Sequence, residues 1–174
     1  SLSPLEPQAP RPQTVAEGLL RGSAEPGEDI VRARDVWARY DRGGAWVLRG
    51  ADLTARAGAV HAVVGGNGCG KSTLLKVAAG AMRTQRGSVR TFARATCGYL
   101  PQDPKTLFVC DSVAEELAEW HDRAGYTAED EQEQLARFGL DGILDRHPYD
   151  LSGGQQQLLA LAKLSLLHPS VYLL

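Results

Sequence analysis

The sequence has few of the residues that build disulfide frameworks or metal centres. Its cysteines, Cys69, Cys97 and Cys110, are odd in number, far apart and without C-x-x-C spacing. This pattern argues against a disulfide-stapled domain and against a zinc site. The histidines also lack metal-ligand spacing, at His61, His121, His147 and His168. These absences fit a protein of a reducing compartment.

Long hydrophobic runs and a signal peptide are missing as well. No apolar stretch approaches the ~20 residues that a membrane-spanning helix needs, and the first residue is Ser1 rather than Met. The formal net charge is −2, so the chain has no overall attraction to nucleic acid. We therefore expect a soluble, cytosolic segment that is excised from a longer protein.

The charge that is present is unevenly placed. Residues 111–133 hold nine acidic side chains and a single basic one, Arg123. We interpret this stretch as a solvated helical face. Such a face would be a poor surface for a nucleic-acid backbone.

The 174 residues leave room for one domain with a core and a short appendage. Residues 1–28 contain five of the nine prolines and few large apolar side chains, a composition typical of a disordered linker without regular structure. The pattern changes at Asp29, and residues 29–174 are the predicted domain.

The first half of this domain has the patterns of strands around one helix. Residues 59–64 are almost wholly apolar and end at glycine, which indicates a buried parallel strand. A helix is expected from Lys71 to about Met82. The other expected strands are a pair at 30–40 and 47–55, joined by a turn at 41–44, and two short strands at 87–92 and 96–100.

The second half is predicted to be mainly helical. Ser112-x-x-Glu115 is a capping box that opens a helix to about Trp120. Thr127 begins a second helix, with Gly139 as its stop. Ser152 opens a long helix whose expected apolar stripe is Leu158, Leu159, Leu161, Ala162 and Leu166. Pro169 ends that helix, and another buried strand is expected at 171–174.

A glycine-rich string follows the apolar run at 59–64 and precedes the expected helix. It reads Gly65-Gly66-Asn67-Gly68-Cys69-Gly70-Lys71-Ser72 and has the form G-x-x-x-x-G-K-[ST]. Backbone N–H groups and the positive end of a helix dipole bind phosphates in such a loop. A chance match in a glycine-rich turn is on the order of one in a hundred or rarer at ordinary glycine frequencies. We infer a nucleotide site.

Each part of the string has an expected role in that site. Lys71 supplies a flexible positive charge to the β- and γ-phosphates, and the Ser72 hydroxyl is a ligand of Mg²⁺. Cys69 stands at a helix N-terminus, where a thiol can be reactive; the interpretation that we favour is a small residue tolerated by the loop. The predicted phosphate-binding residues are Gly65, Gly66, Asn67, Gly68, Cys69, Gly70, Lys71, Ser72 and Thr73.

A second string opens the last long helix and reads Leu151-Ser152-Gly153-Gly154-Gln155. Ser152-x-x-Gln155 alone is a common capping box. Two glycines in the first turn of a helix cost stability, which indicates that another molecule approaches this backbone. Placed after a phosphate loop, the string resembles the signature motif of ATP-binding-cassette (ABC) ATPases, and the resemblance extends over roughly residues 30–174.

The resemblance implies an α/β fold of the P-loop NTPase class. The family combines a RecA-like core and an antiparallel β subdomain with a helical signature subdomain, here incomplete at the C-terminus. The resemblance implies that the core is formed by residues 29–104 and 168–174 and the helical subdomain by residues 105–167 approximately. In this family the signature contacts ATP that is held by another cassette, so a homodimer, a heterodimer or a tandem fusion is implied.

Two further residues take roles from the resemblance. Tyr40 matches the aromatic residue that stacks on adenine. Gln102 matches the glutamine that reaches Mg²⁺ or the attacking water. The implied cofactors are thus ATP and Mg²⁺, with Lys71 and Gln102 as catalytic residues and with Ser72 and Gln102 as metal ligands.

One branch of the family is closest in style. Residues 99–108 and 111–117 resemble the ATPase subunits of energy-coupling-factor (ECF) importers, which take up vitamins and transition-metal ions. This resemblance implies an integral membrane transport subunit as partner, a peripheral place on the cytoplasmic face of the membrane, and no nucleic acid. Leu158 departs from the family pattern, which usually has Arg or Lys there.

The family also has an Asp and a catalytic Glu directly after the strand expected at 171–174, and then a switch His. None of these is present in the 174 residues. Metal binding and water activation would each lose a group. We expect these residues alone to bind ATP weakly at most and not to hydrolyse it.

Two other functions stay open. A non-transport ABC ATPase acting on DNA or ribosomes is disfavoured, because only 48 residues separate Gln102 from Leu151 and the family's genome-maintenance members carry long insertions there. A regulatory cassette that binds ATP without hydrolysing it is the other alternative. We expect the ATP-binding, transport-coupled ATPase domain of an ECF-type importer.

Overall fold

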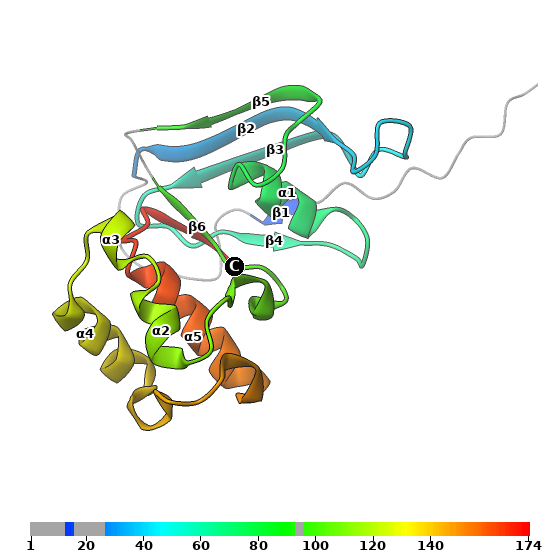
Figure 1. Ribbon diagram of the computed structural model, residues 1–174. Helices are drawn as coiled ribbons and strands as arrows, with labels where there is room; N and C mark the ends of the chain where they lie inside the picture. The colour runs from blue at the N-terminus through cyan, green and yellow to red at the C-terminus, as the bar shows by residue number, and fades with distance from the viewer. Residues whose placement is uncertain (1–12, 16–26, 93–95) are drawn as a thin grey trace, which may run out of the picture. The chain divides into compact units, whose positions relative to one another are not determined.

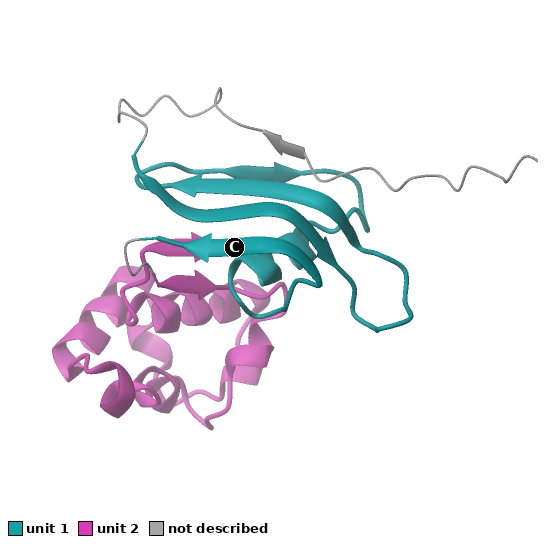
Figure 2. Ribbon diagram, turned by 90° about the horizontal axis from the view of Figure 1, so that it is seen from above, with its two compact units in different colours: residues 1–95 teal, residues 96–174 magenta. Residues whose placement is uncertain are grey.

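The computed structural model describes residues 13–15, 27–92 and 96–174 (Figure 1). The chain divides into two compact units, residues 1–95 and residues 96–174 (Figure 2). Most of the predicted linker at 1–28 lies outside the described residues. Gln13–Val15 within it forms strand β1, which pairs antiparallel with β4 (Ala62–Val64). The expectation of no regular structure was wrong for these three residues, because the edge of β4 offers unpaired backbone groups to an extended segment.

Three strands of the first unit form an antiparallel sheet in the order β3-β2-β5. Val31 and Ala33 of β2 are fully buried, whereas Arg32 between them is partly exposed, as alternation along a strand requires. The strands are β2 (Asp29–Ala38), β3 (Leu48–Arg56) and β5 (Arg86–Thr91). The predicted strand pair and the predicted strand at 87–92 are confirmed.

Helix α1 (Lys71–Ala78) packs against β2 and β3 through buried residues that include Leu74 and Val77. The helix is shorter than the predicted 71–82. Gly80 has a φ of 75°, a left-handed conformation that ends helices. The packing of Leu74 and Val77 places α1, and with it the end of the glycine loop, on this sheet.

Strand β4 differs from the buried parallel strand predicted at 59–64. It spans only Ala62–Val64, its first and last residues are exposed, and its ladder with β1 is antiparallel. An apolar run predicts an extended segment but does not specify its neighbours. Within the described residues β1 is the only strand that pairs with β4, so the prediction of burial and parallel pairing was wrong.

The second unit combines a parallel strand pair with helices. Strand β6 (Cys97–Tyr99) pairs in parallel with β7 (Val171–Leu173). Both strands were predicted, although the expected burial at 171–174 holds only for Leu173, since Tyr172 is 44% exposed. The helices are α2 (Val113–Ala118), α3 (His121–Ala124), α4 (Ala128–Phe138) and α5 (Gly153–Ser165), and the short 3-10 turns are η1 (Pro104–Leu107), η2 (Asp141–Ile143) and η3 (Pro148–Asp150).

The helix starts follow the predicted caps with one exception. Thr127 and Ser152 each form a complete capping box, and Gly139 ends α4 in the left-handed conformation. At α2 the Ser112 hydroxyl accepts from the Glu115 N–H at 3.2 Å. The Glu115 carboxylate accepts from the Asp111 N–H instead, so only half of that predicted box is present.

The core of the second unit lies around α5, which packs against α2, α4, η1 and β6. Leu159 and Ala162 are fully buried, as predicted for the apolar stripe. Leu158 is 39% exposed and was wrongly included in it, because adjacent positions on a helix point about 100° apart and Leu159 faces the core. Across residues 27–92 and 96–174, no helix is long and apolar enough to cross a membrane.

Candidate functional site

The glycine-rich string forms a loop from Gly65 to Gly70 between β4 and α1, in the first unit. Gly70 is the N-cap of α1 and has a φ of 98°. A Cβ at this position would lie 2.8 Å from the Leu48 Cδ2 atom, so both the backbone angle and the close packing require glycine. No side chain caps α1, and its first turn holds no acidic residue. The backbone N–H groups at this helix start are thus free of side-chain acceptors and suit an anion.

The Lys71 side chain folds back over the loop. Its Nζ donates to the carbonyl oxygens of Gly65 and Gly66, each at 2.9 Å. These are exposed hydrogen bonds to neutral acceptors, which phosphate oxygens can replace at little cost. Ser72, the predicted metal ligand, is exposed in the first turn of α1.

Cys69 is packed inside the loop. Its side chain is 4% exposed, and its Sγ lies 4.0 Å from the Lys71 Nζ. A Cβ on Gly65 would be only 2.6 Å from this Sγ. The thiol therefore fills space beside the first glycine of the loop, which fits the favoured interpretation of a small packing residue.

Tyr40, the predicted adenine-stacking residue, follows the end of β2. Its hydroxyl and the Thr73 hydroxyl are 3.1 Å apart, and Lys76 Nζ lies 5.7 Å from its ring centroid. The residue is 61% exposed. The first unit thus brings Tyr40 together with the helix that ends the phosphate loop.

The remaining predicted residues belong to the second unit. Gln102 is exposed in a bend between β6 and η1. Leu151 is buried, whereas Ser152, Gly153 and Gly154 are exposed at the start of α5. The predicted residues therefore fall into two groups, Tyr40 with Gly65–Thr73 in one unit and Gln102 with Leu151–Gln155 in the other.

The start of α5 is capped and yet open. The Ser152 Oγ accepts from the Gln155 N–H at 3.3 Å, and the Gln155 Oε1 accepts from the Ser152 N–H at 3.0 Å. The Ser152 hydroxyl keeps its own proton for donation, because it is an acceptor in this bond. A Cβ on Gly153 or Gly154 would meet nothing within 4 Å, so packing within the described residues does not require glycine at either position.

A buried charged cluster that was not predicted joins this helix to α2. The side chains of Lys163 on α5 and Glu116 on α2 form an ion pair, and both are 0% exposed. Glu116 thus contradicts the interpretation of residues 111–133 as a solvated face. A signal was present: Lys163 is four residues after Leu159 and therefore on the buried side of α5. A lysine there requires a buried acidic partner.

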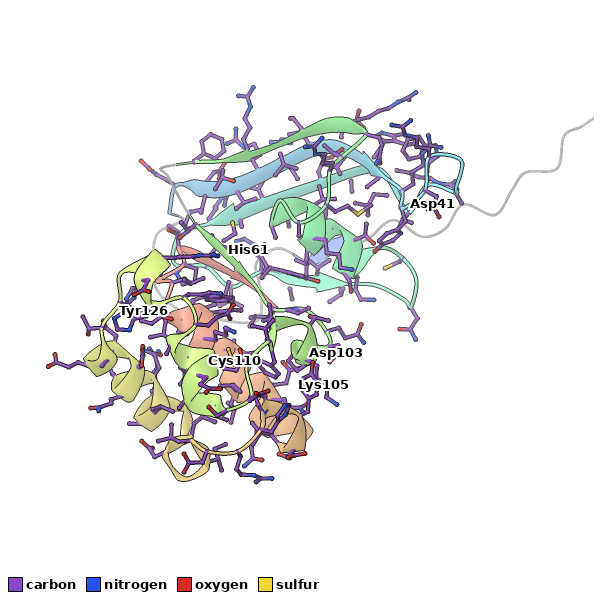
Figure 3. The ribbon with its side chains drawn as sticks, viewed as in Figure 1. Asp41, His61, Asp103, Lys105, Cys110 and Tyr126 are labelled. Carbon is purple, nitrogen blue, oxygen red and sulfur yellow. The ribbon has the colours of Figure 1, made fainter. Side chains whose placement is uncertain are left out.

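Cys110 borders the same cluster, and Figure 3 labels it on the segment before α2. Burial, helped by the negative charge of Glu116, raises the pKa of the Cys110 thiol. The raised pKa favours the protonated form of this thiol.

The ABC transporter family model matches residues 48–174. The chain belongs to the ABC transporter family. Its α/β P-loop NTPase fold, predicted from the two strings, is confirmed by this match and by the fold of solved ABC ATPases.

Relatives and solved structures agree with this assignment. An ABC transporter ATP-binding protein of Bacillus anthracis is 34% identical over 92% of this chain and 31% of its own length. A Bacillus subtilis protein named for HMP/thiamine import, YkoD, is 32% identical over 90% of this chain and 30% of its own length. The solved structure of cbiO1 from Clostridium perfringens, part of the ABC transporter complex cbiONQ, has a TM-score of 0.69 at 24% identity and covers 83% of this chain and 64% of that one.

Proposed function

We propose that this ABC chain is part of the ATP-binding component of an importer, in which two cassettes hold ATP between them. The chain spans about a third of the length of the curated relatives just described. The observation that carries the proposal is that the chain has two exposed helix starts of different kinds. The start of α1 has a glycine loop with a lysine, and the start of α5 has an open glycine pair without one.

The α1 site is the one that supports phosphate binding by the same chain. The loop N–H groups and the N-terminus of α1 would hold the phosphate oxygens, and Lys71 would exchange its loop carbonyls for them. Tyr40, fixed by its contact with Thr73, would stack on the adenine. When bound with ATP, Mg²⁺ screens the phosphate charge, and Ser72 and Gln102 are the residues we assign to hold it.

The α5 site supports contact with the ATP of a second cassette. It can offer the hydroxyl proton of Ser152 and the N–H groups of Gly153 and Gly154, which no side chain covers. It has no cation in its first turn, since the only basic residue of α5 is Lys163 in the last turn. Such a surface can complete a nucleotide site that another cassette forms, but it is poorly suited to binding a nucleotide by itself.

We assign the importer to the ECF type. This assignment is supported by the resemblance of residues 99–108 and 111–117, by the thiamine-import name of YkoD and by the likeness in fold to cbiO1. It carries with it a vitamin or metal ion as cargo, an integral membrane subunit as partner and a peripheral place on the cytoplasmic face of the membrane. Hydrolysis belongs to the full-length protein, and the inactivity of the 174 residues alone stays a prediction.

The test separates the two helix starts in the native full-length protein. We expect Gly153→Asp to leave the Kd for ATP within about twofold of the wild-type value, because the α1 site is intact. We expect its ATP turnover to fall by at least about a hundredfold, because a carboxylate then faces the γ-phosphate of the other cassette. Gly142→Asp, at an exposed glycine of η2 whose Cβ would also meet nothing within 4 Å, is the matched control.

Two results would contradict the proposal. Wild-type ATP turnover by the Gly153→Asp protein would show that the start of α5 does not contact the ATP of a second cassette. ATP binding without any turnover in the wild-type protein would support a regulatory cassette instead.

A further inference from the structure

The helix that begins with the signature string ends on a buried lysine. Lys163 lies near the end of α5, and its side chain is 0% exposed. An ammonium group has three protons to donate. Here they are directed at three acceptors, namely the Leu107 carbonyl oxygen at 3.1 Å and the carboxylates of Glu116 and Glu119. The Lys163 Nζ also lies 4.6 Å from the centroid of the Trp120 ring.

Both oxygens of the Glu116 carboxylate are also hydrogen-bonded. The Glu116 Oε2 atom accepts a hydrogen bond from the Lys163 ammonium group, and the Glu116 Oε1 atom accepts hydrogen bonds from the backbone N–H groups of Val109 and Cys110. A buried ion pair survives in a protein interior only when its remaining polar atoms are also paired. Glu119 is 29% exposed, so solvent stabilises part of the second carboxylate.

These contacts connect three segments of the second unit. Leu107 ends η1, and Val109 and Cys110 follow it, so this segment is the continuation of the Gln102 bend. Glu116 and Glu119 belong to α2 and its C-cap. Lys163 belongs to the helix whose first residues are the signature string. One ammonium group therefore links the segment after Gln102 to the signature helix.

We propose that Lys163, through Glu116, is a positioning residue. It fixes the signature helix α5 against residues 104–110, the segment that directly follows the Gln102 bend. This inference rests on the proposed function, because it assigns α5 the task of presenting Leu151–Gln155 to a second cassette. Packing of apolar residues alone would hold α5 in the core. Lys163 donates directly to the Leu107 carbonyl oxygen, and Glu116, its ion-pair partner on α2, accepts from the N–H groups of Val109 and Cys110. These directional bonds add a defined register of α5 and α2 against that segment.

A metal site is the rival interpretation of the same cluster. One ligand atom from each of Cys110, Glu116 and Glu119 lies within 4.8 Å of the others. The Lys163 ammonium already donates to both carboxylates. It supplies the positive charge that a cation would bring, so the cluster is satisfied as it stands.

The experiment uses the native full-length protein and the double variant Lys163→Met/Glu116→Leu. Replacing both charges by apolar side chains of similar size commonly leaves stability unchanged or higher, so the fold should be retained. Misplacement of a contacting group by about 1 Å can cost on the order of a hundredfold in rate. We expect kcat for ATP hydrolysis to fall by about tenfold to a hundredfold, with the Kd for ATP within about twofold of wild type.

Two further variants separate positioning from general damage. Lys163→Arg keeps the positive charge and the donors, and we expect at least about a third of the wild-type kcat. Lys105→Met removes an exposed lysine of η1, and we expect wild-type kcat. A double variant with a kcat within about twofold of wild type would overturn the inference.

A distance measurement tests the same inference without any ATP turnover. Spin labels at the exposed positions Lys105 of η1 and Leu158 of α5 report the separation of the two segments. We expect a narrow distance distribution with Lys163 and Glu116 present, and a broadened or shifted one in the double variant. An unchanged distribution overturns the positioning role. Absence of ATP turnover in the wild-type protein would instead overturn the proposed function, and the distance distribution would still test the positioning role of Lys163.

If the double variant does not fold, the spin-labelled Lys163→Gln single variant is measured in its place. A broadened or shifted distribution again supports the positioning role, and an unchanged one overturns it.

Discussion

The hydroxyl oxygens of Tyr40 and Thr73 lie 3.1 Å apart. Thr73 is buried in the first turn of α1, whereas Tyr40 is 61% exposed beyond the end of β2. This hydrogen bond fixes an exposed aromatic ring to the helix that follows the phosphate loop. The position suits the proposed role of Tyr40, stacking on the base of a nucleotide whose phosphates the loop would hold.

The first prediction concerns this ring. We expect Tyr40→Ala to raise the Kd for ATP about tenfold, because stacking of a base on an aromatic side chain is worth ~1–3 kcal/mol. Tyr40→Phe keeps the ring and loses only the bond to Thr73, so its Kd should stay within about threefold of wild type. Titration calorimetry of the native protein with ATP checks both values. Equal affinities of the Ala and wild-type proteins would show that Tyr40 does not contact the base.

The second prediction concerns the packing of Cys69 inside the loop. A Cβ on Gly65 would lie 2.6 Å from the Cys69 Sγ, and overpacking of this kind costs ~1–3 kcal/mol. We expect Gly65→Ala to weaken ATP binding about tenfold because the loop must deform. Adding Cys69→Ala removes the clashing sulfur and should restore the affinity to within about threefold of the Cys69→Ala protein.

The outcome of the double variant decides the cause. If Gly65→Ala/Cys69→Ala binds ATP as weakly as Gly65→Ala, the defect does not come from the sulfur. In that case the added methyl group would be blocking the phosphates themselves.

Local sequence rules predicted the features that depend on a few neighbouring residues. The caps at Thr127, Ser152 and Gly139 and the glycine loop that leads into α1 all belong to this class. Each is specified by a side chain and a backbone angle within four residues of one another. The structure therefore agrees with these predictions closely.

Features that depend on distant partners were missed. The prediction that β4 is buried was wrong, because the neighbours of a strand depend on residues far from it in the sequence, here the Gln13–Val15 segment. The Lys163–Glu116 pair joins residues 47 positions apart; the place of Lys163 on the buried side of α5 indicates an acidic partner, but no local pattern shows that this partner is Glu116. The glycine-rich string indicated the roles of Lys71 and Ser72 by itself, whereas the roles of Tyr40, Gln102 and Leu151–Gln155 came only from the family resemblance.

The third prediction concerns acid stability at the start of α4. The backbone N–H of Thr127 donates to the Asp130 carboxylate, as does the Thr127 hydroxyl, and these bonds lower the pKa of Asp130 below its usual range. A carboxyl with a lowered pKa stabilises the fold above its ordinary pKa. That contribution is lost as the pH falls through the lower, folded-state value. We expect Asp130→Asn to remove this acid-dependent part of the protection of the α4 amides.

Hydrogen exchange of the α4 amides between pH 6 and about 3 measures this protection, after correction for intrinsic exchange. The matched control is Glu133→Gln, which removes one exposed negative charge from the same helix. Identical pH dependence of the two variants would contradict the role of the capping box.

We propose above all that this chain binds the phosphates of ATP through the loop before α1. The most direct measurement is the Kd for Mg·ATP of the native protein against that of Lys71→Ala, with Lys105→Ala as a control for the loss of one lysine. A charge-assisted hydrogen bond is worth ~1.5–3 kcal/mol, so we predict that Lys71→Ala weakens binding at least about tenfold while Lys105→Ala has the wild-type Kd. Equal affinities of the Lys71→Ala and wild-type proteins would contradict the account.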